Sequence, residues 1–413
     1  MEKTKSIVVL DVGTYKTVVA VGEIKDGELY ITAVGEALTR GLDKGLVVRS
    51  FDAIQSIKEA VDKAESIIGY KIDSVIANAS GYHIVCANES EEEVFPEGAK
   101  TIQDEDIDAL LNKLADSIET NGYEILHIIP KKYKLDGYNE VEEPVGLTAS
   151  KLEGEFHLIL VRENDYKNLK RVITEAGIRP IDFVANPVAS AEAVLYEDEK
   201  DLGVAVIDIG AGTTDIAVFI DKGLDYTTSI PIAGNQITMD IAHRFKISKE
   251  EAETIKVDYG TALLEYADNS IIEVLPIGVD EPIQINNVEL VETIEARLTE
   301  IFELVKAKLD KKGYTNKLKG GIVLTGGVAN TPDIKTLAET VFKTDVRIGK
   351  PKDFKGYNDK LYKPEYSTTV GIMLYHKANL IDNSVGLFSI FADKEIDIFS
   401  FVKRIIDKLK GSF

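Results

Sequence analysis

Two segments far apart in the chain share one pattern of apolar and polar positions. Residues 7–30 read IVVLDVGTYKTVVAVGEIKDGELY, and residues 204–226 read VAVIDIGAGTTDIAVFIDKGLDY. Each opens with a continuous apolar run, which is typical of a strand buried on both faces. Each continues with Asp-x-Gly, a second apolar strand and a turn that contains glycine. The repeat predicts two β-hairpins that belong to two copies of one α/β domain.

The tips of these hairpins carry the candidate chemistry. Glycines let backbone N–H groups approach phosphate oxygens with no Cβ in the way, and hydroxyl or ammonium groups add further donors. A carboxylate beside phosphates makes sense only as a partner of Mg²⁺ or its waters, and we assign that role to Asp11 and Asp208. The candidate phosphate-binding residues are Asp11, Gly13, Thr14, Tyr15 and Lys16 in the first turn, and Asp208, Gly210, Ala211, Gly212, Thr213 and Thr214 in the second. The alternative is a pair of plain hairpins with turn-forming Asp and Gly, which the duplication disfavours.

A third glycine-rich element follows the second turn. Residues 321–324 form a short apolar strand that ends in Thr325-Gly326-Gly327, with Val328 next. A Gly-Gly pair at the end of a strand lets the chain pass close to a flat group, such as an adenine and its ribose. Gly-Gly alone is a common turn, so its weight comes from its position after the second hairpin. The three elements together predict a nucleotide site, with ATP as the expected ligand, between two related halves.

Composition and charge narrow the class of protein. A chain of 413 residues is long enough for two or more domains, each with its own core. The formal charge of −22 argues against a nucleic-acid grip, because a phosphate backbone demands a basic face. A single cysteine excludes an internal disulfide framework, and no segment approaches the roughly 20 apolar residues of a membrane span. We therefore expect a protein whose bulk lies in the cytosol.

Residues 396–410 differ from the acidic remainder of the chain in their charge. Placed on a helix, residues 396–410 divide into one apolar and one largely basic face. The alternative is a terminal helix that packs its apolar face on the body, but bulky apolar residues opposite a basic face favour a helix lying in an anionic membrane surface. The candidate membrane-binding residues are Ile398, Phe399, Phe401, Val402, Lys403, Arg404, Ile405, Ile406 and Leu409.

With these elements in place, the chain resembles the actin/Hsp70/sugar-kinase ATPase superfamily. Residues 186–193 (NPVASAEA) and 366–372 (YSTTVGI) match its two connecting helices. Within the superfamily, the chain is similar to the bacterial cell-division protein FtsA family, notably at residues 232–245 (IAGNQITMDIAHRF), 252–260 (AETIKVDYG) and 295–309. The resemblance implies further nucleotide contacts at Gly234, Asn235, Glu253, Lys256, Gly326, Gly327 and Val328.

The resemblance also implies the fold and its division. We expect an α/β actin-like ATPase fold, with two duplicated RNase H-like domains around a nucleotide cleft, an inserted small α+β subdomain and a C-terminal amphipathic helix. The expected subdomains are 1–84 with 163–197 and 361–378; the insertion 85–162; 198–229 with 303–360; and an outer subdomain 230–302. A linker, 379–395, and the membrane-binding helix, 396–413, complete the chain.

The family implies a function and its partners. It implies a protein that binds ATP and Mg²⁺, polymerises, and tethers FtsZ filaments to the cytoplasmic face of the inner membrane at the division septum. Expected partners are the FtsZ C-terminal tail, other copies of this chain, anionic lipid and other division proteins, with at most weak ATPase activity. Arg297 is a candidate for the FtsZ contact, although a surface ion pair explains it equally well. A PilM-like pilus-assembly protein and a small-molecule kinase of the same superfamily are the alternatives.

Overall fold

The computed structural model describes residues 5–356 and 359–381 of the chain. The predicted linker begins at residue 379, but its first three residues belong to a helix that ends at Ile381. The rest of that linker and the predicted membrane-binding helix, 396–413, lie outside the described residues. Within the described ranges, no helix is both long enough and apolar enough to cross a bilayer.

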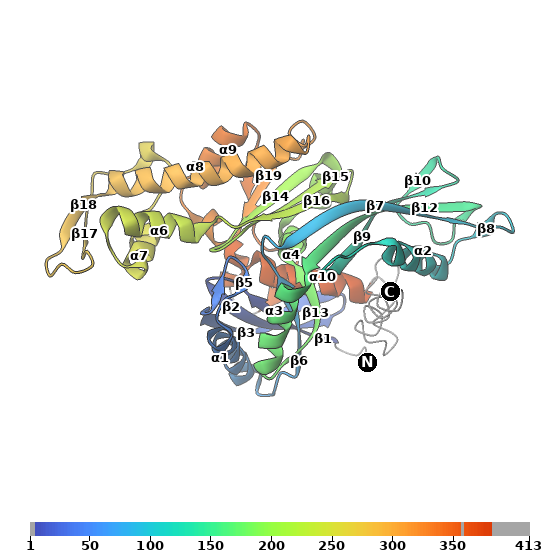
Figure 1. Ribbon diagram of the computed structural model, residues 1–413, viewed down its shortest axis with the longest axis horizontal. Helices are drawn as coiled ribbons and strands as arrows, with labels where there is room; N and C mark the ends of the chain where they lie inside the picture. Colours follow the sequence, from blue (N-terminus) through green and yellow to red (C-terminus); the bar gives the residue numbers. More distant parts are fainter. Residues whose placement is uncertain (1–4, 357–358, 382–413) are drawn as a thin grey trace.

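The first lobe is built on a six-stranded sheet (Figure 1). β1, β2 and β3 are antiparallel neighbours, while β6 and β13 run parallel beside β1. Helix α1 (Ser50–Ile68) packs on the sheet through small residues such as Ala60, and a Cβ at Gly35 of β3 would overlap the Ala60 carbonyl. In spatial order the strands are β13 (Arg179–Ala185), β6 (Ser74–Ala79), β1 (Lys5–Val12), β2 (Lys16–Lys25), β3 (Glu28–Leu38) and β21 (Phe354–Gly356).

The second lobe repeats this topology. Its antiparallel strands β14, β15 and β16 correspond to β1, β2 and β3, and its parallel strands β19 and β20 correspond to β6 and β13. The five strands are, in spatial order, β16 (Gly223–Ile230), β15 (Thr214–Ile220), β14 (Val204–Ile209), β19 (Ile322–Thr325) and β20 (Val346–Ile348). The predicted duplication is therefore present in the order and direction of the strands as well as in the hairpins.

Two helices cross between the lobes. They are α4 (Asn186–Val194) and α10 (Ser367–Ile381), and each has a residue of its first turn, Asn186 or Thr368, in the wall of a cavity between the lobes. They cross so closely that a Cβ at Gly371 of α10 would overlap the Ala189 carbonyl of α4. This explains the small residues of both segments, because larger side chains would separate the helices and, with them, the two lobes.

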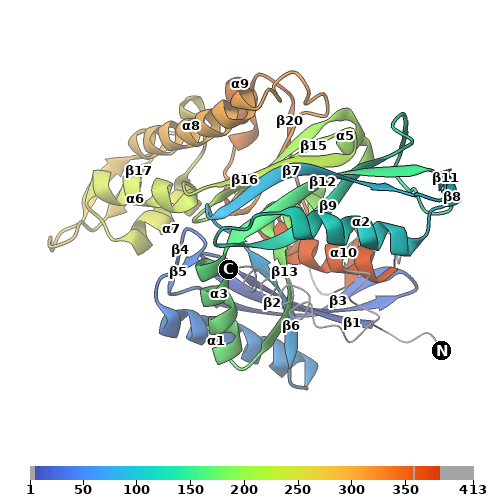
Figure 2. The same cartoon turned by 45° about the vertical axis from the view of Figure 1, so that its right-hand side comes forward.

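The inserted subdomain projects from the first lobe at one end of the molecule (Figures 1 and 2). Its four-stranded sheet has the order β10-β9-β12-β7 and is covered by helix α2, which buries Leu110 and Leu114 against Phe156 and neighbouring side chains. β7 lies beside β16 of the second lobe, where the Asn88 side chain donates to the Asp225 carbonyl at 2.9 Å. The insert thus contacts both lobes. Its elements are β7 (Ile84–Val94), β8 (Lys100–Thr101), α2 (Asp104–Ser117), β9 (Tyr123–Leu135), β10 (Asn139–Val141), β11 (Thr148–Ala149) and β12 (Lys151–Arg162).

The outer part of the second lobe occupies the opposite end (Figure 1). Its longest element, α8, buries an apolar stripe with helical spacing that includes Leu290, Ile294 and Leu298. The helices and strands of this part are α6 (Gly234–Phe245), α7 (Lys249–Tyr259), β17 (Ile271–Val274), β18 (Ile283–Asn286) and α8 (Asn287–Lys311). The remaining elements of the molecule are β4 (Leu42–Asp43), β5 (Leu46–Val47), α3 (Glu163–Glu175), α5 (Glu197–Leu202) and α9 (Ile334–Phe342).

Candidate functional site

The predicted nucleotide residues meet at one cavity between the lobes. The cavity has a volume of about 510 Å³, and it is lined by both hairpin tips, by the start of α6, by α7 and by the loop after β19. The predicted residues that line it are Asp11, Gly13, Thr14, Tyr15, Lys16, Asp208, Gly210, Ala211, Gly212, Thr213, Gly234, Asn235, Glu253, Lys256, Gly326, Gly327 and Val328. The topology thus brings together residues that are separated by more than three hundred positions in the chain.

The two hairpin tips share one turn geometry. The Gly13 N–H donates to the Lys16 carbonyl at 3.1 Å, and the Gly210 N–H donates to the Thr213 carbonyl at 3.0 Å. The tips also touch each other, because a Cβ at Gly212 would overlap the Thr14 side chain. Glycine at 212 therefore lets the lobes close with their turns in contact.

A buried carboxylate stands at the base of each turn. Asp11 accepts a hydrogen bond from the Thr369 hydroxyl at 2.7 Å, and Asp208 accepts from the hydroxyls of Ser190 and Thr368. Burial raises the pKa of Asp11 to about 6, and burial likewise raises the pKa of Asp208. Both carboxylates line the cavity, so a cation bound there would favour their charged forms.

These residues fit a hydrated magnesium ion better than a direct protein cage. Among the described residues, no three side chains of the His, Cys, Asp and Glu types gather closely enough to hold a metal. Mg²⁺ commonly keeps several waters and binds through one or two carboxylates together with phosphate oxygens. Asp11 and Asp208 could hold the ion in that way, where it would neutralise phosphate charge between the turns.

The sequence interpretation missed a third carboxylate, Asp215 of β15. It pairs with Asp208 across the hairpin and also lines the cavity. Its Oδ2 accepts from the hydroxyls of Ser80 at 3.2 Å and Thr213 at 3.1 Å, whereas its buried Oδ1 has no hydrogen-bond partner among the residues that the structure describes. Burial, reinforced by the nearby charge of Asp208, raises the pKa of Asp215 to about 7. The repeat held a signal for it, since the position that pairs with Asp11 in the first hairpin is Val18.

Thr214 is the predicted nucleotide residue that does not line the cavity, and its phosphate contact stays a prediction. Its side chain is buried on the other face of β15, where the hydroxyl donates to the Ile232 carbonyl at 2.8 Å. Successive residues of a strand point to opposite faces, so Thr213 and Asp215 face the cavity and Thr214 cannot.

The loop after β19 packs directly on the second turn. Gly326 has a φ of 84°, and a Cβ there would overlap the Asp208 carboxylate and lie 2.6 Å from the Ile209 carbonyl oxygen. The next residue, Gly327, meets only the Glu365 Cβ, at 3.9 Å. Gly326 is therefore required by the backbone, whereas Gly327 leaves open space along the cavity wall.

Lys16 lies in the first turn, already in contact with other groups of the chain. Its Nζ is 3.2 Å from the centre of the Tyr366 ring and 3.8 Å from Glu36 Oε1. Burial lowers the pKa of Lys16, and the carboxylates around it oppose that shift. Lys256, at the other end of the cavity, donates to Glu253 Oε2 at 2.6 Å, so these two predicted residues form an ion pair on the cavity wall.

Arg297 lies away from the cavity, on α8. Its Nε and Nη2 donate to the two carboxylate oxygens of Asp240 at 2.6 and 3.0 Å, and its Nη1 pairs with Glu300. The ion-pair interpretation therefore describes Arg297 in this structure, and the guanidinium is already engaged by carboxylates of its own chain.

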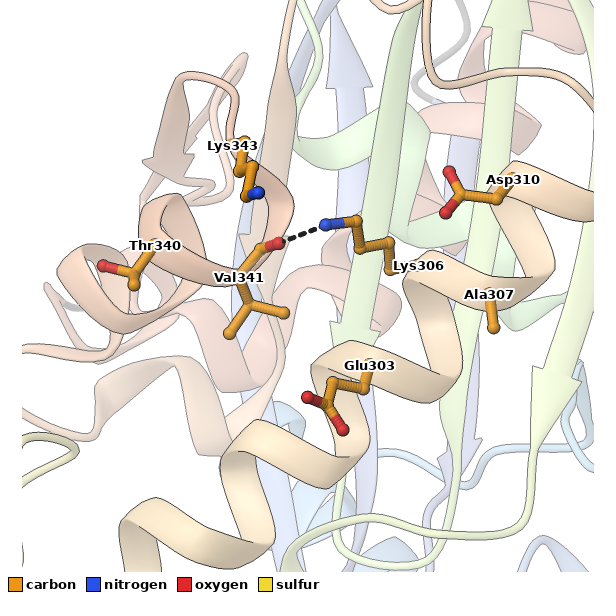
Figure 3. A pocket seen from close by; sticks show the side chains of 7 residues that line it. All are labelled: Glu303, Lys306, Ala307, Asp310, Thr340, Val341 and Lys343. Atoms are coloured by element: carbon orange, nitrogen blue, oxygen red, sulfur yellow. Dashed lines mark hydrogen bonds between the residues drawn. The ribbon is translucent and has the colours of Figure 1, made fainter.

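A second hollow, of about 440 Å³, lies between α8 and α9 (Figure 3). Lys306 crosses it and donates to the Val341 carbonyl at 2.7 Å, close to the end of α9. Its other charged linings are Glu303, Asp310 and Lys343, and it contains none of the predicted site residues. Lys306 thus stabilises the C-terminal end of α9. The predicted site residues meet at the cavity between the lobes instead.

Two repeated sheets around such a cleft, with crossing helices at its floor, define the actin-like ATPases. The likeness to solved structures agrees with this class. A PilM–PilN type IV pilus biogenesis complex matches with a TM-score of 0.64 at 15% identity, over 90% of this chain and 98% of that one. MreB5 of Spiroplasma citri bound to ADP matches with a TM-score of 0.55 at 15% identity, over 92% and 99%. At such low identity these matches show the fold alone, and they confirm the predicted fold class.

The sequence comparisons narrow the class to one family. Residues 205–371 match the family model of cell division protein FtsA, and residues 81–160 match the SHS2 domain inserted in FtsA. A cell division protein FtsA from Pseudomonas aeruginosa is 36% identical over 382 residues, which cover 91% of this chain and 90% of that protein. This chain belongs to the FtsA family of cell-division proteins, as the motifs predicted.

Proposed function

We propose that the cleft binds ATP with Mg²⁺ and that the nucleotide acts mainly as a switch for conformation and polymerisation. One observation carries this proposal: equivalent carboxylates, Asp11 and Asp208, stand at the base of two duplicated glycine turns that face each other across one cavity. In the described ranges of the chain, both carboxylates accept from hydroxyl groups and neither forms an ion pair, so a cation supplied with the nucleotide would balance their charge. The ADP-bound MreB5 structure supports nucleotide binding by this fold.

The proposal gives each wall of the cavity a task. The turn backbones at Gly13 and Gly210 and the Lys16 ammonium bind phosphate oxygens, while Gly326 and Gly327 border the adenosine. Mg²⁺, when bound, supplies positive charge between the phosphates and the two carboxylates. Binding then links the two lobes directly, because each lobe contributes one turn to the same ligand. Hydrolysis, where it occurs, is slow.

Calorimetric titration with ATP, with and without Mg²⁺, tests this site. Asp208→Ala should abolish Mg²⁺-dependent ATP binding, because it removes one of the two carboxylates that hold the hydrated ion. Asp258→Ala, an exposed substitution on α7, is the matched control and should leave binding unchanged. Unchanged affinity in Asp208→Ala would remove the basis for the site.

We further propose that the protein tethers division filaments to the membrane. The support is its family together with the amphipathic pattern of residues 396–413, a terminal segment that lies outside the described residues. One short helix binds lipid weakly, so a polymer with many anchors would gain affinity by avidity. The proposed location is the cytoplasmic face of the inner membrane at the division septum.

Sedimentation with anionic vesicles tests the tether. The full chain should sediment with the lipid, and a chain that lacks residues 396–413 should remain in the supernatant. A matched full-length variant, Phe401→Asp, should lose lipid binding because it places a charge on the apolar face. Sedimentation of the truncated chain with lipid would contradict the tether.

The proposed partners include the FtsZ C-terminal tail, which we place on the outer subdomain, residues 230–302. The family supports this partner, and the boundaries proposed above define the fragment to map by hydrogen exchange. Because Arg297 is bound to Asp240, Arg297→Ala is expected to affect tail binding mainly through loss of this local ion pair. Protection by the tail peptide that falls on the insert instead of the outer subdomain would reject this placement.

A further inference from the structure

A chain of hydrogen bonds, buried at its start and partly buried beyond, joins the two hairpin turns beneath the cavity. It starts at Asn78, the fifth residue of β6, whose side chain is 1% exposed. The Val12 N–H, next to Asp11 in the first turn, donates to Asn78 Oδ1 at 2.7 Å. Asn78 is thus the neighbouring strand's contact with the first turn.

The direction of every bond in this chain is forced by chemistry. A backbone N–H can only donate, so the oxygen of the Asn78 amide must face Val12 and its Nδ2 must face away. Asn78 Nδ2 then donates to Asn186 Oδ1 at 3.0 Å. This leaves Asn186 Nδ2 turned toward Asp215 Oδ2, at 3.5 Å, and a carboxylate can only accept.

The chain ends at the cavity. Asn186 is the first residue of the crossing helix α4, and both Asn186 and Asp215 line the cavity. Asp215 Oδ2 accepts from three donors, on Asn186, Ser80 and Thr213, and its Oδ1 has no hydrogen-bond partner within the described part of the chain. The series of hydrogen bonds from Val12 to Asp215 therefore runs from the first lobe, through the crossing helix α4, to the second lobe.

We propose that Asn78 is a positioning residue that sets the orientation of the Asn186 amide and so couples the first turn to Asp215 of the second. Its consequence for the cleft rests on the proposed nucleotide function. With Asn78 in place, Asn186 presents N–H groups to Asp215 and the cavity. With the amide reversed, two acceptor oxygens would face each other at Asp215, and the hydrogen bond between Asn186 and Asp215 would be lost.

A reversal of the chain tests this coupling. In Asn78→Asp the carboxylate still accepts from Val12 but can no longer donate to Asn186, so the Asn186 amide should turn over and oppose Asp215. In the double variant Asn78→Asp with Asp215→Asn, the new amide at 215 can donate to the reversed Asn186, and the chain is complete again in the opposite direction.

The first measurement is the melting temperature of the ligand-free full chain at pH 8. Asn78→Asp should lower it by several degrees. Asp215→Asn should raise it by several degrees more in the Asn78→Asp background than in the wild-type chain, although no hydrogen bond joins residues 78 and 215 directly among the described residues. In an Asn186→Ala background this extra gain should disappear. Ser80→Ala is the matched control: it removes another donor to Asp215 Oδ2 and should show no coupling to position 78.

The second measurement is Mg²⁺–ATP affinity. Asn78→Asp should weaken it about tenfold, the size expected from one misplaced hydrogen bond at a charged site, and the double variant should recover it. Additive changes in melting temperature, a double variant that does not fold, or an equal extra gain without Asn186 would each overturn the proposal. Because the melting experiment uses no ligand, coupling that is present in a protein that binds no ATP would refute only the proposed nucleotide function.

Discussion

The two turns that face each other across the cleft have the same backbone but different chemistry. Both close with a hydrogen bond from glycine to the residue three positions later, and both stand behind a buried aspartate. At the closing position the first turn has Lys16 and the second has Thr213. Opposite the aspartate, across the hairpin, the first lobe has Val18 and the second has Asp215. The two copies therefore share the turn geometry, but their charged side chains differ: the lysine lies in the first lobe and the additional carboxylate lies in the second.

The strands next to the hairpins differ in the same way. β19 pairs with β14 so that Thr325 lies beside Asp208, and continuing the β1–β6 register by one residue places Asn78 beside Asp11. The Thr325 hydroxyl shares a hydrogen bond with the Ser367 hydroxyl of α10, whereas the Asn78 side chain accepts a hydrogen bond from the turn itself. The first lobe therefore stabilises its turn from the neighbouring strand, and the second leaves open space at Gly327.

The largest expected effect comes from Asp215, the carboxylate that the first hairpin lacks. In the folded, metal-free protein its pKa is about 7, well above the value of 3.8 expected in the unfolded chain. The folded state therefore binds the proton more tightly, and stability should fall as the pH rises from about 4 to about 7. The cost is up to about 4 kcal/mol above pH 7, and Asp215→Asn should remove it.

Denaturant unfolding between pH 4 and pH 8 measures this difference. Asp11→Asn is the matched substitution in the first hairpin, where the pKa of about 6 predicts a smaller gain that is complete near pH 6. If the free energy of unfolding depended on pH in the same way in both variants, the proposed difference between the two turns would be contradicted.

The next effect concerns the loop that packs on the second turn only. Gly326→Ala places a methyl group against the Asp208 carboxylate at a φ of 84°, and it should cost about 3 kcal/mol of stability. Gly327→Ala, one residue away, meets no atom closer than 3.9 Å and should fold normally. Thermal unfolding of the two variants is the measurement, and similar losses in both would show that the loop is not fitted to Asp208.

The sequence predicted the elements that repeat and missed most of those that do not. The hairpins, their aspartates and their glycines were recognised because each motif is local and occurs twice. Ser190, Thr368 and Thr369, which donate to the two aspartates, come from α4 and α10. No local pattern says which of many Ser and Thr side chains the topology will bring to a carboxylate, so their contacts could not be predicted.

The contacts of Thr214 and Arg297 differ in how far the sequence could predict them. The position of Thr214 was available from the sequence, because a strand alternates faces and Thr213 had already been assigned to the ligand. The partner of Arg297 was not available, since Asp240 lies on α6 and only the packing of α6 against α8 brings the two together. Periodicity gives the face of one element but not the residues that another element places opposite it.

A smaller effect separates the two closing positions of the turns. Lys16→Met should weaken ATP binding about tenfold, or roughly 1.4 kcal/mol, because it removes the cation that can bind phosphate oxygens. AMP and adenosine should lose much less affinity, since they present fewer charges at that end of the cavity. Thr213→Val, at the equivalent position, should change ATP affinity less. Calorimetry with ATP, AMP and adenosine measures these affinities. An equal loss of affinity for adenosine would show that Lys16 does not contact the phosphates.

The smallest effect isolates the threonines that follow the turns, Thr17 and Thr214. Both are buried, and their hydroxyls bond within their own lobes, to Thr39 and to the Ile232 carbonyl. Thr17→Val and Thr214→Val should each cost about 1 kcal/mol of stability, because a buried hydrogen bond is lost while the shape is kept. ATP affinity should be unchanged in both. If Thr214→Val weakened ATP binding while Thr17→Val did not, the second threonine would contact phosphate after all, and the symmetry of the two strands would end one residue earlier than the structure shows.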